Sequence, residues 1–469
     1  MSFVTRRRPI EAGARADGQA RLKATLGWPH LMALGIGAII GTGIYTLTGV
    51  ASGLAGPAVI LSFAIAGAVC AVAALCYAEM ATLIPQAGSS YTYSYAVLGE
   101  LAAWIVGWSL ILEYTVVCAA VSVGWAGYAA GLIQSAGWGV PAALLAGPEA
   151  GGLVNLPAVL IALAVTGLLL VGTRESATVN FVLVIVKLVA LAGFVALTLP
   201  HFDAANFQPF APFGYGAQAS ADGVKHGVMA AAAIIFFAFY GFDAISTAAE
   251  EAKNPSRDLT IGIIGSMLAC TAIYMVGAAA ALGASPFAVF SRSAEPLAFI
   301  LRDLGQPVAA TLIAGAAVIA LPTVIMVFMY GQSRIFFAMA RDGLLPRGLS
   351  AVGARGVPAP VTILTGVIAA LIAGVLPLGE ITALANAGTL LAFIATAACM
   401  MVLRRRSPDL VRPFRTPLWW LVGPLAIAGC LYLFASLPAA TIIRFFVWNA
   451  LGVVVYLAYG RTRSRLAAA

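Results

Sequence analysis

The sequence alternates long apolar segments with short polar ones, and this alternation limits the possible folds more than any other feature. About 20 consecutive apolar residues suffice to cross the hydrocarbon core of a bilayer as a helix. Only 9% of the residues are charged and 62% are hydrophobic, whereas a soluble domain carries about 25% charged residues. The chain is therefore predicted to be an all-α membrane protein with twelve transmembrane helices, at roughly 30–54, 57–83, 96–131, 154–171, 177–199, 226–248, 260–282, 308–340, 361–377, 382–403, 417–436 and 441–460.

Lysine and arginine are distributed unevenly between the two sides of these segments. With the N-terminus inside, 21 of the 26 Lys and Arg residues fall on the inner side and four on the outer side. Inner loops of membrane proteins carry this excess, so both termini are predicted to be cytoplasmic. The basic clusters flank apolar segments, where they meet anionic lipid headgroups. They therefore explain the net charge of +8 without a nucleic-acid partner.

The first apolar segment contains four glycines within residues 35–45, where a membrane helix should be most regular. Glycine costs about 1 kcal/mol of helix propensity relative to alanine. A broken helix at this depth is tolerated only where it is buried in protein or lines a cavity. One interpretation is a helix that stops near Ile40 and restarts near Ile44, with free backbone groups facing a polar ligand. The alternative is close helix packing through the GxxxG pattern at residues 37–41.

The sixth segment carries a second interruption, which favours the first interpretation. Gly241 and Asp243 follow an aromatic run, of which we expect some members (Phe236, Phe237, Phe239 and Tyr240) to face lipid. Glycine-interrupted segments at corresponding places in two halves of a transporter mark its central site. Half-helix N-termini attract a carboxylate, and half-helix carbonyls attract an ammonium group, so a zwitterion suits both.

Two ionisable residues lie deep inside predicted spans. Lys187 is near the middle of the fifth span and Glu113 is inside the third. A charge at the bilayer centre costs about 2.5–3.5 kcal/mol on the insertion scale, so such residues face the protein interior and have partners. Lys187 is either a coupling group that carries a proton or replaces a bound cation, or a structural lysine on helix-end carbonyls. Glu113 either neutralises a cationic substrate, relays a proton, holds the broken first helix by hydrogen bonds, or is a structural carboxylate.

Several motifs give the chain a resemblance to a known family. They are residues 35–44 (GIGAIIGTGI), 85–91 (PQAGSSY), 241–243 (GFD), 250–255 (EEAKNP), 257–259 (RDL), 331–334 (GQSR) and 338–346 (AMARDGLLP). In order and spacing they resemble the amino acid–polyamine–organocation superfamily, in its branch of bacterial relatives of the cationic amino acid transporters. The resemblance covers about residues 25–435.

The resemblance implies the leucine-transporter fold, with two inverted five-helix repeats and a substrate site between broken first and sixth helices. The implied organisation is a cytoplasmic tail at 1–27, repeats at 28–200 and 224–404, and a last helix pair with a cytoplasmic C-terminus at 405–469. It also implies a bacterial cytoplasmic membrane, no cofactor and no metal. A small single-span subunit is an open possibility, since such proteins are reported with this branch.

The resemblance also assigns candidate site residues. Backbone groups of the first break would receive the substrate carboxylate, at Ile39, Ile40, Gly41, Thr42 and Gly43. The amino group would lie at Phe237, Ala238 and Tyr240. Lys187 matches a lysine linked to proton coupling, and Glu113 matches a glutamate close to the site. The chain departs from the family at residues 239–240, where Phe-Tyr replaces Tyr-Ile and leaves the substrate open.

These expectations favour a proton-coupled transporter that imports neutral or varied L-amino acids by alternating access. A cationic amino acid or polyamine transporter or exchanger is the nearest alternative. A sodium-coupled symporter should lack a cation at Lys187, and an amino acid sensor usually appends a long soluble domain. A membrane enzyme would need a Ser/His pair, zinc ligands or paired aspartates within the spans. The predicted spans contain none of these groupings, so we expect no enzymatic activity.

Overall fold

A computed structural model describes residues 6–9, 26–86, 88–171, 177–220, 223–247, 249, 252–350 and 358–468. Most of the predicted tail at 1–27 lies outside these ranges, as do Arg174 and Arg355 of the charge count. The helices are α1 (Trp28–Ile39), α2 (Thr42–Tyr45), α3 (Leu47–Ala55), α4 (Val59–Leu83), α5 (Ser90–Val97), α6 (Glu100–Ser135), α7 (Leu156–Val171), α8 (Ala177–Thr198), α9 (Val228–Ile235), α10 (Phe242–Thr247), α11 (Pro255–Ala284), α12 (Phe287–Phe290), α13 (Pro296–Asp303), α14 (Pro307–Ala320), α15 (Pro322–Arg341), α16 (Ala359–Val375), α17 (Leu378–Arg406), α18 (Trp419–Ser436), α19 (Ala439–Val455), α20 (Arg461–Arg463) and α21 (Arg465–Ala468).

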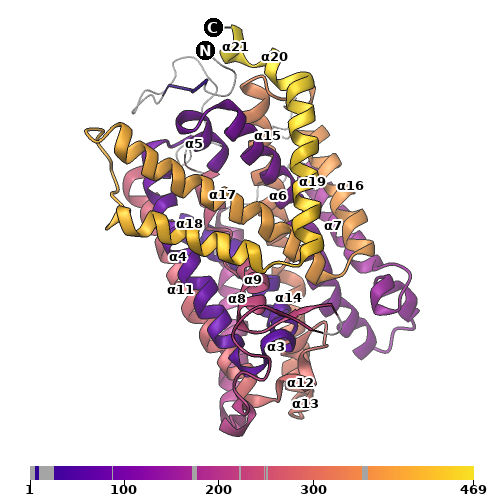
Figure 1. Ribbon diagram of the computed structural model, residues 1–469. Coiled ribbons are helices and arrows are strands. Elements are labelled where there is room, and N and C mark those ends of the chain that lie inside the picture. The colour runs from indigo at the N-terminus through magenta and orange to yellow at the C-terminus, as the bar shows by residue number, and fades with distance from the viewer. Residues whose placement is uncertain are drawn as a thin grey trace.

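The fold is an elongated helical bundle, in which α4 and α11 run along the long direction and α17 and α18 lie across it in the view of Figure 1. The only strands among the described residues are the short antiparallel pair β1 (Gln218–Ala219) and β2 (Lys225–His226). Ten helical stretches of the described residues are long and apolar enough to cross a membrane. Two shorter apolar helices, Leu156–Leu170 and Ala359–Val375, accompany them. The chain is therefore a multi-pass helical membrane protein.

Local sequence explains where several of these helices begin. Proline occupies the first turn of α1, α11, α13, α14, α15 and α16. Its fixed φ suits that turn, and its missing N–H is not needed there. The same effect divides the long eighth apolar segment, because α14 ends at Ala320 and Pro322 starts α15. The long third segment instead forms one continuous helix, α6.

Both predicted interruptions are present. The backbone turns extended at Ile40 (ψ 98°), and the chain restarts as α2 at Thr42, two residues earlier than predicted. In the sixth segment, α9 gives way to a single 3₁₀ turn, Phe236–Ala238, and α10 starts at Phe242. In the 18-residue apolar window of Val228–Thr247, 94% of the residues are buried, so this break is surrounded by protein. A break at such a place satisfies the rule for irregular backbone in a membrane.

Two glycines allow the breaks to exist and to meet. Gly241 has a φ of +125°, which side-chain-bearing residues rarely adopt. A Cβ atom there would also lie 3.0 Å from the backbone of Ala38 in α1. A Cβ atom at Gly43 would overlap Ala238 of the sixth segment. The two interruptions therefore touch through main chain.

Candidate functional site

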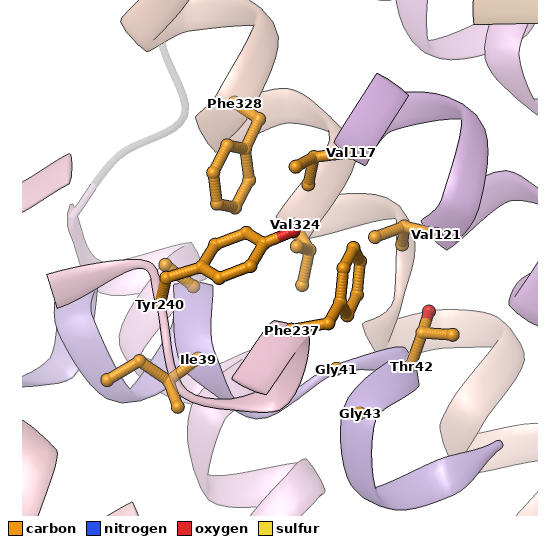
Figure 2. A pocket seen from close by; sticks show the side chains of 11 residues that line it. Ile39, Gly41, Thr42, Gly43, Val117, Val121, Phe237, Tyr240, Val324 and Phe328 are labelled. Atoms are coloured by element: carbon orange, nitrogen blue, oxygen red, sulfur yellow. The ribbon is translucent and has the colours of Figure 1, made fainter. Parts of the chain in front are cut away.

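A small cavity of about 10 Å³ lies between the two interruptions (Figure 2). A cavity of this size holds about one water molecule, so a metabolite fits only when side chains of the lining move. The first segment, the sixth segment, α6 and α15 contribute its lining, which is Ala38, Ile39, Gly41, Thr42, Gly43, Val117, Val121, Phe237, Tyr240, Val324 and Phe328.

One wall of the cavity is the main chain of the first break. The first amides of a helix have no carbonyl one turn earlier to bond, and α2 starts at Thr42 beside the cavity. Two carbonyls near the break, one on each side, are already engaged, because Tyr274 Oη donates to Ile39 O (2.6 Å) and Tyr128 Oη donates to Tyr45 O (2.5 Å). What this wall offers a ligand is therefore N–H groups, which suit an anion.

Hydrogen bonds from side chains of other helices stabilise the interrupted backbone of the sixth segment, and the sequence of this segment does not reveal them. Asp243 accepts hydrogen bonds from the Gly241 amide (2.9 Å) and from Tyr114 Oη on α6 (2.9 Å). Asn386 of α17 donates to the carbonyls of Ala233 (2.6 Å) and Ile234 (3.3 Å) in α9. Side chains from two other helices thus satisfy backbone groups near this break and fix its shape.

The opposite wall of the cavity is aromatic and aliphatic. The Tyr240 ring packs edge-on against Phe237 and Phe328, with centroids 5.0 and 6.1 Å apart. Figure 2 shows Val117 and Val121 of α6 pointing toward these rings. This wall offers a substrate side chain apolar contact.

The prediction that part of the aromatic run faces lipid is wrong. All four side chains are buried, with exposed fractions of 6% or less: Phe236, Phe237, Phe239 and Tyr240. Phe239 packs against Phe63 of α4, and Phe236 packs against Phe393 of α17. The irregular backbone lets the rings radiate in different directions, and other helices surround the segment on every side. No side of this segment is left for lipid.

The structure brings together six of the nine residues predicted to contact substrate. Ile39, Gly41, Thr42, Gly43, Phe237 and Tyr240 line the cavity, whereas Ile40, Ala238 and Glu113 do not. Ala238 instead supports Gly43 from behind. Sequence reasoning missed Val117, Val121, Val324 and Phe328 on α6 and α15. Their spacing of four residues is a helical-face pattern, but a lipid-facing stripe shares it.

Glu113 is completely buried beside the cavity rather than in its lining. Neither carboxylate oxygen makes a hydrogen bond to a described residue. The helix backbone at Gly388 of α17 packs directly on its stem. Thr389 and Asp243 lie near enough to influence its charge. The residue therefore forms a buried acidic position behind the cavity wall.

Lys187 is also fully buried, on α8. Its Nζ donates to the Gly37 carbonyl of α1 (2.9 Å) and to Thr323 Oγ1 of α15 (3.0 Å). The expectation that this lysine faces the interior with a partner is confirmed. The ammonium group links α8 and α15 to α1 shortly before the first break.

Comparison with known proteins gives a consistent result over the whole chain. Residues 26–458 match the family model described as amino acid permease. The chain is 44% identical to a branched-chain amino acid permease of Bacillus subtilis, covering 97% of this chain and 96% of that protein. It is 40% identical to the methylthioribose transporter of the same organism, covering 99% and 100%. It is 35% identical to the vacuolar cationic amino acid transporter 4 of Arabidopsis thaliana, covering 87% and 68%. The chain is a transporter rather than an enzyme, and it belongs to the amino acid permease family.

Proposed function

We propose that this protein imports a neutral L-amino acid across the membrane by alternating access, coupled to protons. The observation that carries the proposal is the cavity between the two interruptions, with amide-rich main chain on one side and apolar side chains on the other. An amino acid presents a carboxylate and a side chain to these two surfaces.

In the proposed complex, the substrate carboxylate accepts hydrogen bonds from amides at residues 41–43. The ammonium group lies at the carbonyl groups of residues 237–240. The side chain then extends along Val117 and Val121 toward Phe328, all of which line the cavity. Burial of an aliphatic side chain in such a site contributes about 0.8 kcal/mol per CH₂ group. This lining favours branched or linear aliphatic substrates over charged ones.

Lys187 is the proposed coupling group. Protonated, it holds α8 and α15 against α1 through Gly37 and Thr323. Loss of the proton on the inner side would remove the charge and one of the three N–H donors of Nζ, weaken this link, and favour release of the substrate.

The proposal includes the topology of twelve spans in two inverted five-helix repeats, at 28–200 and 224–404, with both termini cytoplasmic. Its support is the presence of a break early in each proposed repeat and the excess of Lys and Arg on the inner side. Protease accessibility in sealed, right-side-out vesicles tests it. Cleavage of either terminus from outside the vesicle would contradict the orientation.

The two relatives from Bacillus subtilis name two candidate substrates, a branched-chain amino acid and methylthioribose. The amide-rich main chain favours the first, because methylthioribose carries no carboxylate. A thermal-shift panel of all twenty L-amino acids and methylthioribose on the purified protein distinguishes them. We expect leucine, isoleucine and valine to stabilise the protein most. Stabilisation by methylthioribose alone would refute the amino acid proposal.

A further inference from the structure

Behind the apolar wall of the cavity lie buried oxygen atoms that make no hydrogen bond to a described residue. They are both carboxylate oxygens of Glu113 and the hydroxyl of Tyr240. The great majority of buried polar side-chain atoms in folded proteins are hydrogen-bonded. A fully buried carboxylate without such partners needs an explanation, and its position suggests one.

Glu113 continues a line of residues that already line the cavity. Val121, Val117 and Glu113 follow one another at intervals of four residues on α6, which is a continuous helix. Residues four apart lie on one face, about 6 Å apart along the axis. The first two line the cavity and the third does not. The cavity therefore ends about one helical turn before the carboxylate.

We attribute this end of the cavity to the side chain of Tyr240. Figure 2 shows the ring reaching across the cavity below Phe328, with its hydroxyl directed toward the side of Val117. Phe237 and Phe328 pack against the ring and hold it there. Glu113 is close enough to the Tyr240 hydroxyl to act on it electrostatically. The Tyr240 hydroxyl therefore lies toward the part of α6 from which Glu113 projects one turn beyond Val117.

We infer that Tyr240 determines substrate charge by closing the cavity off from an acidic subsite around Glu113. This inference rests on the proposed function, since the substrate must be anchored by its carboxylate at residues 41–43. With Tyr240 in place, only a neutral side chain finds partners. Without it, a lysine or arginine side chain reaches Glu113, whose two oxygens accept hydrogen bonds from an ammonium or guanidinium group.

The test is ligand binding to the purified protein with L-arginine, L-citrulline and L-leucine. Citrulline has nearly the shape of arginine but no charge, so the pair separates charge from size. In Tyr240→Ala we expect L-arginine to bind at least about tenfold more tightly than to the wild type, as close charge pairs in buried sites give. L-citrulline should gain far less. Tyr240→Phe, which keeps the ring, should gain no arginine affinity.

The double variant Tyr240→Ala/Glu113→Gln should lose the gain for arginine while its citrulline affinity changes far less. Tyr240→Ile serves as a second opening variant in case the alanine variant does not fold. The inference is overturned if an opening variant binds leucine but gains no arginine affinity, or if the double variant keeps the gain. Failure of the proposed function would give a different result, namely a wild-type protein that binds no amino acid.

Discussion

Replacement of Lys187 by methionine separates coupling from binding. Methionine keeps most of the length of the side chain and removes both the charge and the titrating proton. The Gly37 carbonyl loses its donor (2.9 Å), while Thr323 keeps its own bond to Ala320 O (2.7 Å). An unsatisfied buried group costs about 1–3 kcal/mol. Removal of a charge from mid-membrane returns about 2.5–3.5 kcal/mol, so we expect Lys187→Met to fold.

The effect of Lys187→Met on transport can be calculated from the pH gradient that drives accumulation. One pH unit across a membrane is worth 1.36 kcal/mol per proton, so one-proton symport supports a substrate gradient of about tenfold. In liposomes with such a gradient, the wild type should approach that accumulation. Lys187→Met should equilibrate leucine to a ratio of about one while still catalysing counterflow, because the cavity is unchanged.

A matched control is Lys225→Met, the same substitution at a lysine in β2. Its Nζ donates to the carbonyls of Ala435 (3.1 Å) and Leu437 (2.8 Å), at the end of α18 rather than at either interruption. This variant should accumulate leucine as the wild type does. If Lys187→Met still accumulated leucine to the wild-type level under the pH gradient, the coupling role would be refuted. Loss of counterflow as well as accumulation would show that Lys187 is needed for folding or for binding instead.

Other substitutions test the breaks and the cavity. Gly241→Ala forces a side chain into a backbone conformation with φ +125° and against Ala38; it should lower stability by about 1–3 kcal/mol, measured as a drop in melting temperature without ligand. Phe237→Ala removes an aromatic wall and should weaken leucine binding at least about tenfold in a thermal-shift titration, and Thr42→Val should weaken it less; unchanged affinity in both would remove these residues from the site. Asp243→Asn weakens the bonds from Gly241 and Tyr114; we expect slower uptake with normal surface expression, and an unaltered rate would show that this network is dispensable.

The sequence predicts the apolar segments and both interruptions because each is a local property. Apolar length sets a span, and glycines such as Gly41 and Gly241 weaken a helix wherever it packs. The partners in the site are not local. Thr323 contacts Lys187 across 136 residues, and Asn386 contacts Ala233 across 153. No pattern within one segment indicates which distant segment will supply the donor or acceptor.

The apolar half of the cavity escaped prediction for a related reason. Val117 and Val324 belong to long apolar helices in which most side chains are aliphatic. Whether such a residue faces lipid, another helix or a substrate depends on the rotation of the helix in the bundle. Charged residues are easier to place, because a charge in lipid is so costly that the lipid-facing environment is excluded. This is why Lys187 could be expected to face the interior and Val117 could not.

The contact between Gly43 and Ala238 has a consequence for the choice of ligands. Because only the methyl group of Ala238 lies between the backbones of the two interrupted segments there, extra bulk close to the α-carbon of a ligand would have to displace backbone. The opposite end of the cavity is bounded by side chains, which can rotate. Inhibitors designed for this site should therefore vary at the distal end of the molecule and remain unsubstituted around the α-carbon.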